Sequence, residues 1–129
     1  MPSPPADAPE QHPLATELNA LITSLRQFTH ERDWEQFHSP KNLASALVVE
    51  AAELLEHFQW QTEAQSRAMA PDKVEEASRE MADVFLYLLQ LSDALGVDLL
   101  RAAEQKIALN AQKYPVERAR GNSRKYTEL

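Results

Sequence analysis

The chain has 129 residues, which is the length of a single domain. It contains no cysteine and only two glycines, so disulfides, thiolate nucleophiles, cysteine–zinc sites and glycine-rich phosphate-binding loops are excluded. Any bound phosphate must therefore be held by cations. The 20 acidic and 13 basic residues give a net charge of −7, which argues against duplex nucleic acid as a partner.

The N-terminal segment, residues 1–13, holds five of the eight prolines. We expect a disordered arm there, because such a segment has too few apolar side chains to pack. It lacks the basic region and apolar core of a secretory signal, and no run in the chain approaches the roughly 18–20 apolar residues of a membrane span. These features predict a cytoplasmic protein with no membrane partner.

The later prolines, at positions 40, 71 and 115, divide the chain into helix-sized intervals rich in Ala, Leu, Glu, Gln, Lys and Arg. The predicted helices cover residues 14–31, 41–60, 72–95 and 98–113. No alternating pattern typical of strands competes with them, so the predicted fold class is all-α.

Three capping signals support these boundaries. Ser39 stands before a proline and is expected to cap the second helix, and Asp72 with Glu75 has the spacing of a capping box for the third. Gly96 is a plausible C-cap. Apolar residues at helical spacing predict the buried stripes: Leu14, Leu18, Leu21, Ile22, Leu25 and Phe28; Leu43, Leu47, Leu54 and Phe58; Met81, Val84, Phe85, Leu88, Leu91 and Leu95; Leu99, Ala102, Ala103 and Ile107. The polar Asn110 is a further candidate for the inward face of the last helix.

Two of the helices carry acids one turn apart, Glu50 with Glu53 and Glu80 with Asp83. Glu50 lies on the leucine stripe of its helix, where an inward carboxylate is costly unless it is paired or binds a metal. Oxygen-only ligands suit Mg²⁺, with Mn²⁺ as an alternative. The competing interpretation is that all four acids lie on solvated helix faces.

Four segments in order make the chain similar to a known family: Glu31–Leu43, Glu50–Trp60, Arg79–Leu88 and Asn110–Leu129. The chain resembles the all-α nucleoside triphosphate pyrophosphohydrolases of the MazG-like group, and especially their dCTP pyrophosphatase branch. The resemblance implies a four-helix bundle over residues 14–113, a C-terminal tail over 114–129 that completes the site, and a homodimer or homotetramer.

The resemblance also implies an activity, the Mg²⁺-dependent hydrolysis of dCTP or a related, including a 5-modified, deoxynucleoside triphosphate to the monophosphate and pyrophosphate. Such an enzyme would cleanse the nucleotide pool. The alternatives are a pyrophosphatase of different or broader specificity, a non-catalytic helical interaction module, and a nucleotide-binding regulator.

Individual roles follow from the same resemblance. The implied metal ligands are Glu50, Glu53, Glu80 and Asp83, and the implied catalytic acids are Glu50, Glu53 and Glu56. The implied base-contacting residues are Trp34, His38, Trp60 and Tyr87. The implied phosphate and sugar contacts are Lys106, Asn110, Lys113, Arg124 and Lys125.

Simpler interpretations stand beside several of these roles. The two tryptophans could be core residues, since Trp is highly buried on average, and the basic tail could be a solvated terminus. His57, one turn after Glu53, is interpreted as its partner within the helix, with a role in the site as the alternative. Leu25 stands where the dCTP branch can carry a base-contacting histidine, which puts a base contact from the first helix in doubt.

Overall fold

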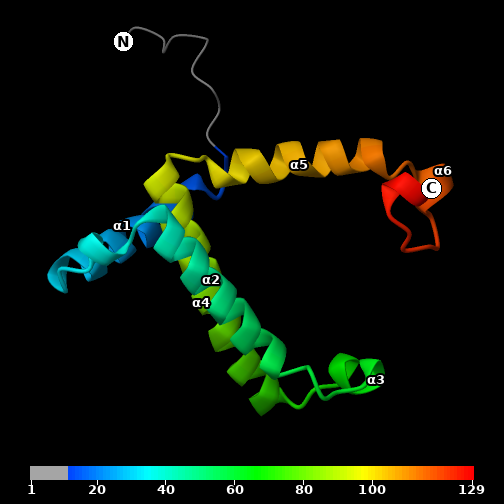
Figure 1. The fold of residues 1–129 in the computed structure, drawn as a ribbon, viewed down its shortest axis with the longest axis horizontal. Coiled ribbons are helices and arrows are strands. Elements are labelled where there is room, and N and C mark those ends of the chain that lie inside the picture. The colour runs from blue at the N-terminus through cyan, green and yellow to red at the C-terminus, as the bar shows by residue number, and fades with distance from the viewer. Residues whose placement is uncertain (1–11) are drawn as a thin grey trace, which may run out of the picture. The chain divides into compact units, whose positions relative to one another are not determined.

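A computed structural model describes residues 12–129, and helices are the regular secondary structure over that range (Figure 1). The all-α fold class is confirmed. The predicted arm over residues 1–13 lies, apart from its last two residues, outside the described part of the chain. The elements are α1 (Ala15–Glu31), the 3₁₀ turn η1 (Glu35–Phe37), α2 (Pro40–Glu56), α3 (Glu63–Arg67), α4 (Pro71–Leu95), α5 (Leu99–Lys113), α6 (Val116–Ala119) and the 3₁₀ turn η2 (Tyr126–Glu128). Within residues 12–129, no helix combines the length and apolar character needed to cross a membrane.

The observed caps of α2 and α4 agree in part with those predicted from the sequence. Ser39 caps α2, because its Oγ accepts a hydrogen bond from the Asn42 backbone N–H at 3.2 Å. Gly96 ends α4 in the left-handed conformation with φ of 66°, as predicted. The predicted cap at Asp72 is wrong: Ala70 is the N-cap of α4 and makes no side-chain bond. Proline at the first helical position forces the residue before it to be extended, so the helix begins earlier than Asp72.

The segment between α2 and α4 contains a short helix that was not among the helices predicted from the sequence. α2 ends at Glu56 rather than at residue 60, and the short helix α3 follows. Thr62 and Gln65 form a reciprocal capping box at its start: Thr62 Oγ1 accepts from Gln65 N–H at 3.1 Å, and Gln65 Oε1 accepts from Thr62 N–H at 3.0 Å. The Thr-x-x-Gln spacing was the available sequence signal for this helix.

The described part of the backbone divides into two compact units, residues 12–96 and 97–129. The predicted division into a 14–113 domain and a 114–129 tail stays a prediction. In the first unit, α2 and α4 lie side by side and antiparallel, and α1 packs on α4 (Figure 1). Arg26 of α1 donates two hydrogen bonds to Asp93 of α4, of which the Nε–Oδ2 bond is 2.8 Å long. This contact fixes α1 beside the C-terminal half of α4.

The buried core of the described chain is small. Its buried hydrophobic residues are Leu43, Ala77 and Leu89. The predicted stripe of α4 is wrong at Met81, Phe85 and Leu95, which are 58%, 41% and 58% exposed. Because α1 and α2 cover only one side of α4, the side that carries these three residues is left uncovered in the first unit. In α5, the predicted inward residues Ala103, Ile107 and Asn110 are likewise exposed.

Candidate functional site

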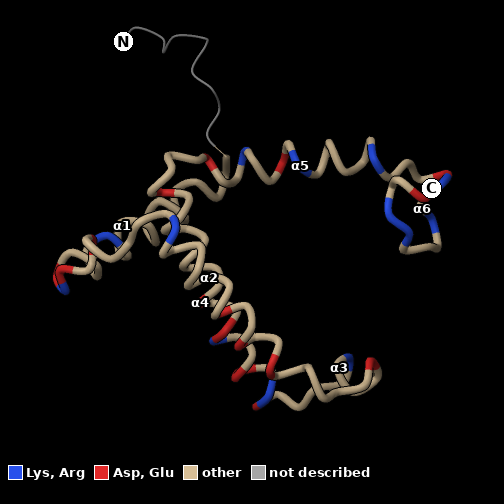
Figure 2. Tube along the Cα trace, in the orientation of Figure 1, with Lys and Arg blue, Asp and Glu red and all other residues tan. Residues whose placement is uncertain are grey.

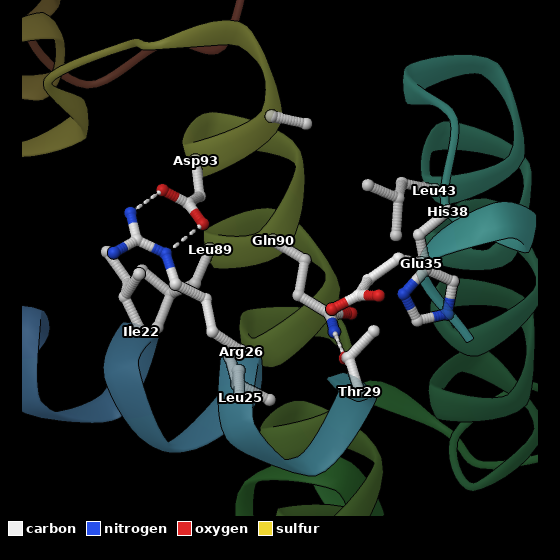
Figure 3. A pocket seen from close by; sticks show the side chains of 11 residues that line it. Ile22, Leu25, Arg26, Thr29, Glu35, His38, Leu43, Leu89, Gln90 and Asp93 are labelled. Atoms are coloured by element: carbon white, nitrogen blue, oxygen red, sulfur yellow. Dashed lines mark hydrogen bonds and ion pairs between the residues drawn. The ribbon is translucent and has the colours of Figure 1, made fainter. Parts of the chain in front are cut away.

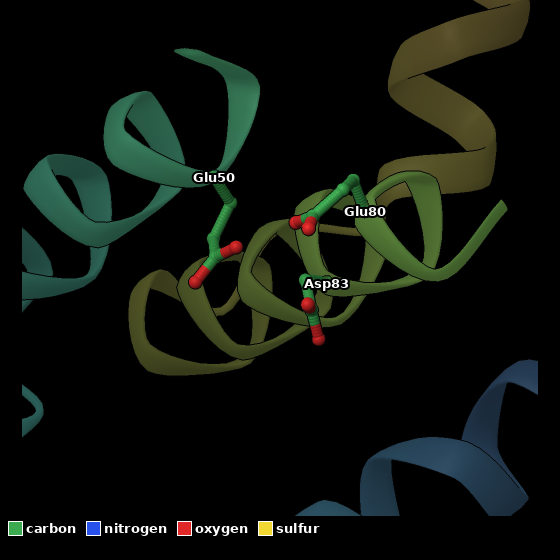
Figure 4. Close-up of side chains that lie close together, drawn as sticks. All are labelled: Glu50, Glu80 and Asp83. Atoms are coloured by element: carbon green, nitrogen blue, oxygen red, sulfur yellow. The ribbon is translucent and has the colours of Figure 1, made fainter. Parts of the chain in front are cut away.

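Acidic side chains from α2 and α4 meet in the middle of the helix pair. Glu50 of α2 and Glu80 and Asp83 of α4 each place one carboxylate oxygen within 4.8 Å of the others (Figure 4). Glu50 and Glu80 are partly buried, whereas Asp83 is exposed. The structure therefore brings together three of the four implied metal ligands, and Figure 2 shows acidic residues along both helices at this level.

The fourth acid, Glu53, lies beside Glu50. Partial burial, the neighbouring Glu53 carboxyl and then Asp83 and Glu80 together raise the pKa of Glu50 to about 7, with burial the largest cause. Glu53 thus belongs to the same group of interacting carboxyls. We call Glu50, Glu53, Glu80 and Asp83 the acidic cluster.

Two oxygens of the acidic cluster lack hydrogen-bond partners. Glu50 Oε2 and Glu80 Oε2 are buried and accept no hydrogen bond. A buried oxygen left without a donor costs stability, and it costs more when it carries charge. A divalent cation that prefers oxygen ligands satisfies such atoms and neutralises the mutual repulsion of the carboxylates. The donor set therefore fits Mg²⁺ or Mn²⁺.

The interpretation of His57 as the partner of Glu53 is wrong. Because α2 ends at Glu56, His57 is the C-cap residue, and its Nε2 lies 4.0 Å from Glu80 Oε1 across the helix pair. Glu56 itself is exposed at the end of α2, and its catalytic role stays a prediction.

A cavity of about 180 Å³ opens along the same helix pair, next to α1 and η1 (Figure 3). It is lined by Ile22, Leu25, Arg26, Thr29, Glu35, His38, Leu43, Leu89, Gln90, Asp93 and Ala94. Gln90 Nε2 donates a long hydrogen bond of 3.4 Å to Thr29 Oγ1. Sequence analysis did not anticipate Gln90 or the pair Arg26–Asp93 in a cavity wall, because contacts between distant helices leave no local pattern.

The cavity lies the same number of residues away from the acidic cluster along α2 as along α4. Leu43 precedes Glu50 by seven positions on α2, and Gln90 follows Asp83 by seven on the antiparallel α4. At about 1.5 Å per residue, the two features are roughly 10 Å apart along the helices. A ligand with one end in the cavity and the other at the acidic cluster would have to span that length.

The four implied base-contacting residues do not form one group in this chain. His38 lines the cavity. The Trp34 ring packs edge-on against the His38 ring, with the ring centroids 6.3 Å apart. Tyr87 is half-buried on α4. Trp60 is 88% exposed beyond the end of α2, whereas Trp34 lies before its beginning. Since α2 has 17 residues and is about 25 Å long, one chain does not bring the two tryptophans together.

The implied phosphate contacts all lie in the second unit, where they are exposed: Lys106, Asn110, Lys113, Arg124 and Lys125. The first three share one face of α5, being four and three residues apart. Tyr126 packs edge-on against Tyr114 at 6.1 Å, and Lys113 Nζ lies 5.0 Å from the Tyr126 ring. These contacts hold the end of the chain near the end of α5, where Figure 2 shows several basic residues. Their phosphate role stays a prediction.

The chain is similar in sequence to mammalian dCTP pyrophosphatases. It is 47% identical over 105 residues to dCTP pyrophosphatase 1 of Rattus norvegicus and 45% identical over the same length to that of Homo sapiens. Each alignment covers 80% of this chain and 62% of the relative, so the chain spans less than two thirds of the length of these relatives.

A solved structure agrees with this similarity. The crystal structure of a pyrophosphatase from Archaeoglobus fulgidus superposes with a TM-score of 0.70 at 34% identity, covering 84% of this chain and 99% of that chain. The sequence model of the MazG-like family matches residues 46–129, which include every member of the acidic cluster. Because this match extends over more than half of the chain, the protein belongs to the MazG-like family.

Proposed function

We propose that this protein is a Mg²⁺-dependent nucleoside triphosphate diphosphatase that hydrolyses dCTP, or a related deoxynucleoside triphosphate, to the monophosphate and pyrophosphate. The observation that carries the proposal is the meeting of carboxylate oxygens from Glu50, Glu80 and Asp83 within 4.8 Å. The names of the relatives support the reaction and the substrate: two are dCTP pyrophosphatases and one is a pyrophosphatase. The cytoplasmic location expected from the sequence stays a prediction.

The acidic cluster would hold the cation through Glu50, Glu53, Glu80 and Asp83. A divalent cation supplies charge neutralisation for a triphosphate and lowers the pKa of an attacking water. Either Glu50 or Glu53 would accept the proton of that water at its carboxylate while still serving the cation site. The lysines of α5 and the basic tail would stabilise charge on the leaving pyrophosphate.

We assign the base to the cavity beside α1. Its distance from the acidic cluster, roughly 10 Å along the helices, is suited to a nucleotide whose phosphates lie at the acids. His38 lines the cavity, and Trp34, which packs edge-on against His38, would present an aromatic face beside it. Because cavity walls that are largely apolar discriminate weakly between bases differing by a methyl group, 5-modified dCTP is expected to be a substrate as well.

We further propose that the protein acts as a homodimer or homotetramer. The face of α4 with Val74, Met81 and Phe85 is exposed, and so are Val48 and Leu55 of α2. Large apolar side chains exposed in this number are typical of interfaces, and a second copy of the chain would cover them. In such an assembly, Trp60 of one copy can approach the cavity of another, which the chain's own Trp60 does not reach.

Removing a cluster carboxylate should abolish turnover without unfolding the protein. For Glu53→Gln and Asp83→Asn we expect kcat/KM for dCTP to fall by at least about 100-fold, because cation binding and charge stabilisation are both weakened. Pyrophosphate release measures the activity, and circular dichroism checks the helices. Glu75→Gln is the matched control on α4, since Glu75 is exposed and only pairs with Arg79 at 3.5 Å. Wild-type activity in both cluster variants would contradict the assignment.

The raised pKa of Glu50 predicts a pH dependence of stability in metal-free buffer. Between the ordinary value of 4.5 and about 7, the folded protein holds a proton on Glu50 that the unfolded chain releases. The free energy of unfolding should therefore fall as pH rises through this window, and added Mg²⁺ should restore it above pH 7. Urea denaturation in EDTA from pH 4.5 to 8, with Glu50→Gln as reference, measures the effect. Equal pH slopes in both proteins would be inconsistent with it.

Trp34→Ala should raise the KM for dCTP about tenfold with kcat little changed, because a stacking face for the base is lost. Discrimination among deoxynucleoside triphosphates should relax at the same time. Steady-state kinetics over a panel of bases measures both effects. Phe37→Ala is the control, because Phe37 is an exposed aromatic residue of the same turn, whereas the ring contact with the cavity residue His38 is made by Trp34. A Trp34 variant that is less stable but has the wild-type KM would show that the ring serves core packing alone.

Phe85→Glu should shift the protein toward the monomer, because it places a charge in the proposed interface between copies. Sedimentation equilibrium at micromolar concentration measures the mass. Val116→Glu introduces the same charge at an exposed apolar site of the second unit and should leave the mass unchanged. A wild-type protein that sediments as a monomer would refute the assembly.

A further inference from the structure

The cavity beside α1 has polar side chains gathered at one end. Thr29, Glu35, His38 and Gln90 line it, and we call these four residues the polar end of the cavity. Figure 3 shows the Glu35 carboxylate and the His38 ring on the side of Gln90 that faces away from the ion pair between α1 and α4. The Trp34 backbone N–H donates to Thr29 O at 3.0 Å, which brings the turn η1, and Glu35 with it, to the end of α1.

The groups left free at the polar end are hydrogen-bond acceptors. Gln90 Nε2 donates to Thr29 Oγ1 at 3.4 Å, and within residues 12–129 no donor is bonded to Gln90 Oε1. One carboxylate oxygen of Glu35 lies 3.0 Å from His30 Nδ1, which leaves the other oxygen free. An amide oxygen and a carboxylate oxygen accept hydrogen bonds and donate none. His38 can donate or accept, so it sets no preference of its own.

Two acceptors at one end of a cavity fit an exocyclic amino group. The N4 amino group of cytosine carries two N–H donors, whereas thymine and uracil present a carbonyl oxygen at the same position. That oxygen would face two further acceptors, and each would lose its water without gaining a donor. The Arg26 guanidinium, a strong donor in the cavity wall, is bonded to Asp93 and is therefore not free to offset this cost.

We propose that Gln90 and Glu35 bind the 4-amino group of the base, and that they make the protein select 4-aminopyrimidines over 4-oxopyrimidines. This inference rests on the proposed function, because it concerns the base of the same substrate. Gln90 Oε1 accepts one hydrogen of the amino group, and the free oxygen of Glu35 accepts the other. The bond to Thr29 holds the Gln90 amide with its oxygen toward the base.

The test measures nucleotide binding and needs no turnover. The α,β-imido analogues of dCTP and dUTP resist cleavage and differ in the base edge alone, and each is titrated by calorimetry into the full-length protein in Mg²⁺. We expect the wild-type protein to bind the dCTP analogue at least about 100-fold more tightly. Gln90→Met, which keeps the length of the side chain, should lower this preference about tenfold. Gln27→Met is the matched control, since Gln27 is an exposed glutamine of α1 that bonds Glu31 at 2.9 Å.

Glu35→Gln gives a second, independent measure of the preference. The new amide can donate to the carbonyl oxygen of uracil, so the dUTP analogue should bind more tightly to this variant than to the wild-type protein. Because Glu35 is exposed in a short turn, its replacement tests the assignment even if Gln90→Met does not fold.

The outcomes separate this inference from the proposed function. Equal binding of both analogues to the wild-type protein would overturn the selection of the amino group and leave the proposed diphosphatase intact. A wild-type preference that both variants retain would also overturn the inference, because the base would then be recognised elsewhere. Failure of the wild-type protein to bind either analogue would overturn both proposals.

Discussion

The helix pair α2–α4 brings carboxylates from its two helices face to face, and this arrangement costs free energy of folding. Glu50 of α2 meets Glu80 and Asp83 of α4 at short range, and two of the oxygens involved are buried without hydrogen-bond donors. Packing that serves only stability would place apolar residues there, as it does with Leu43 and Leu89 two turns away. A bound cation would remove this cost, which is the physical reason for proposing the acidic cluster as a cation site.

The rest of the first unit holds the two helices in the register that this site requires. Ser39 fixes the start of α2 and Gly96 fixes the end of α4. The hydrogen bonds between Arg26 and Asp93 hold α1 beside α4, and residues of both helices line the cavity. Because the helices are antiparallel, the same displacement along both leads from the acidic cluster to the cavity. One pair of helices thus carries both the acidic cluster and the cavity, to which we assign the phosphates and the base of the proposed substrate.

Much of this was accessible from the sequence because it depends on local patterns. Proline positions and 3.6-residue periodicity located the four long helices, and the spacing of the acids put each pair on one helix face. What depended on distant contacts was not accessible. The exposure of Met81 and Phe85 reflects the absence of a neighbouring helix on that side within the first unit, and the approach of His57 to Glu80 depends on where α2 ends. The separation of Trp34 from Trp60 likewise follows from the length of α2.

We propose that the acidic cluster makes this protein a cation-dependent diphosphatase. This proposal is tested most directly by ³¹P nuclear magnetic resonance of dCTP incubated with the wild-type protein, in Mg²⁺ and in EDTA. We expect equimolar dCMP and pyrophosphate in Mg²⁺ and no turnover in EDTA. Release of dCDP and inorganic phosphate, or turnover that EDTA leaves unchanged, would contradict it.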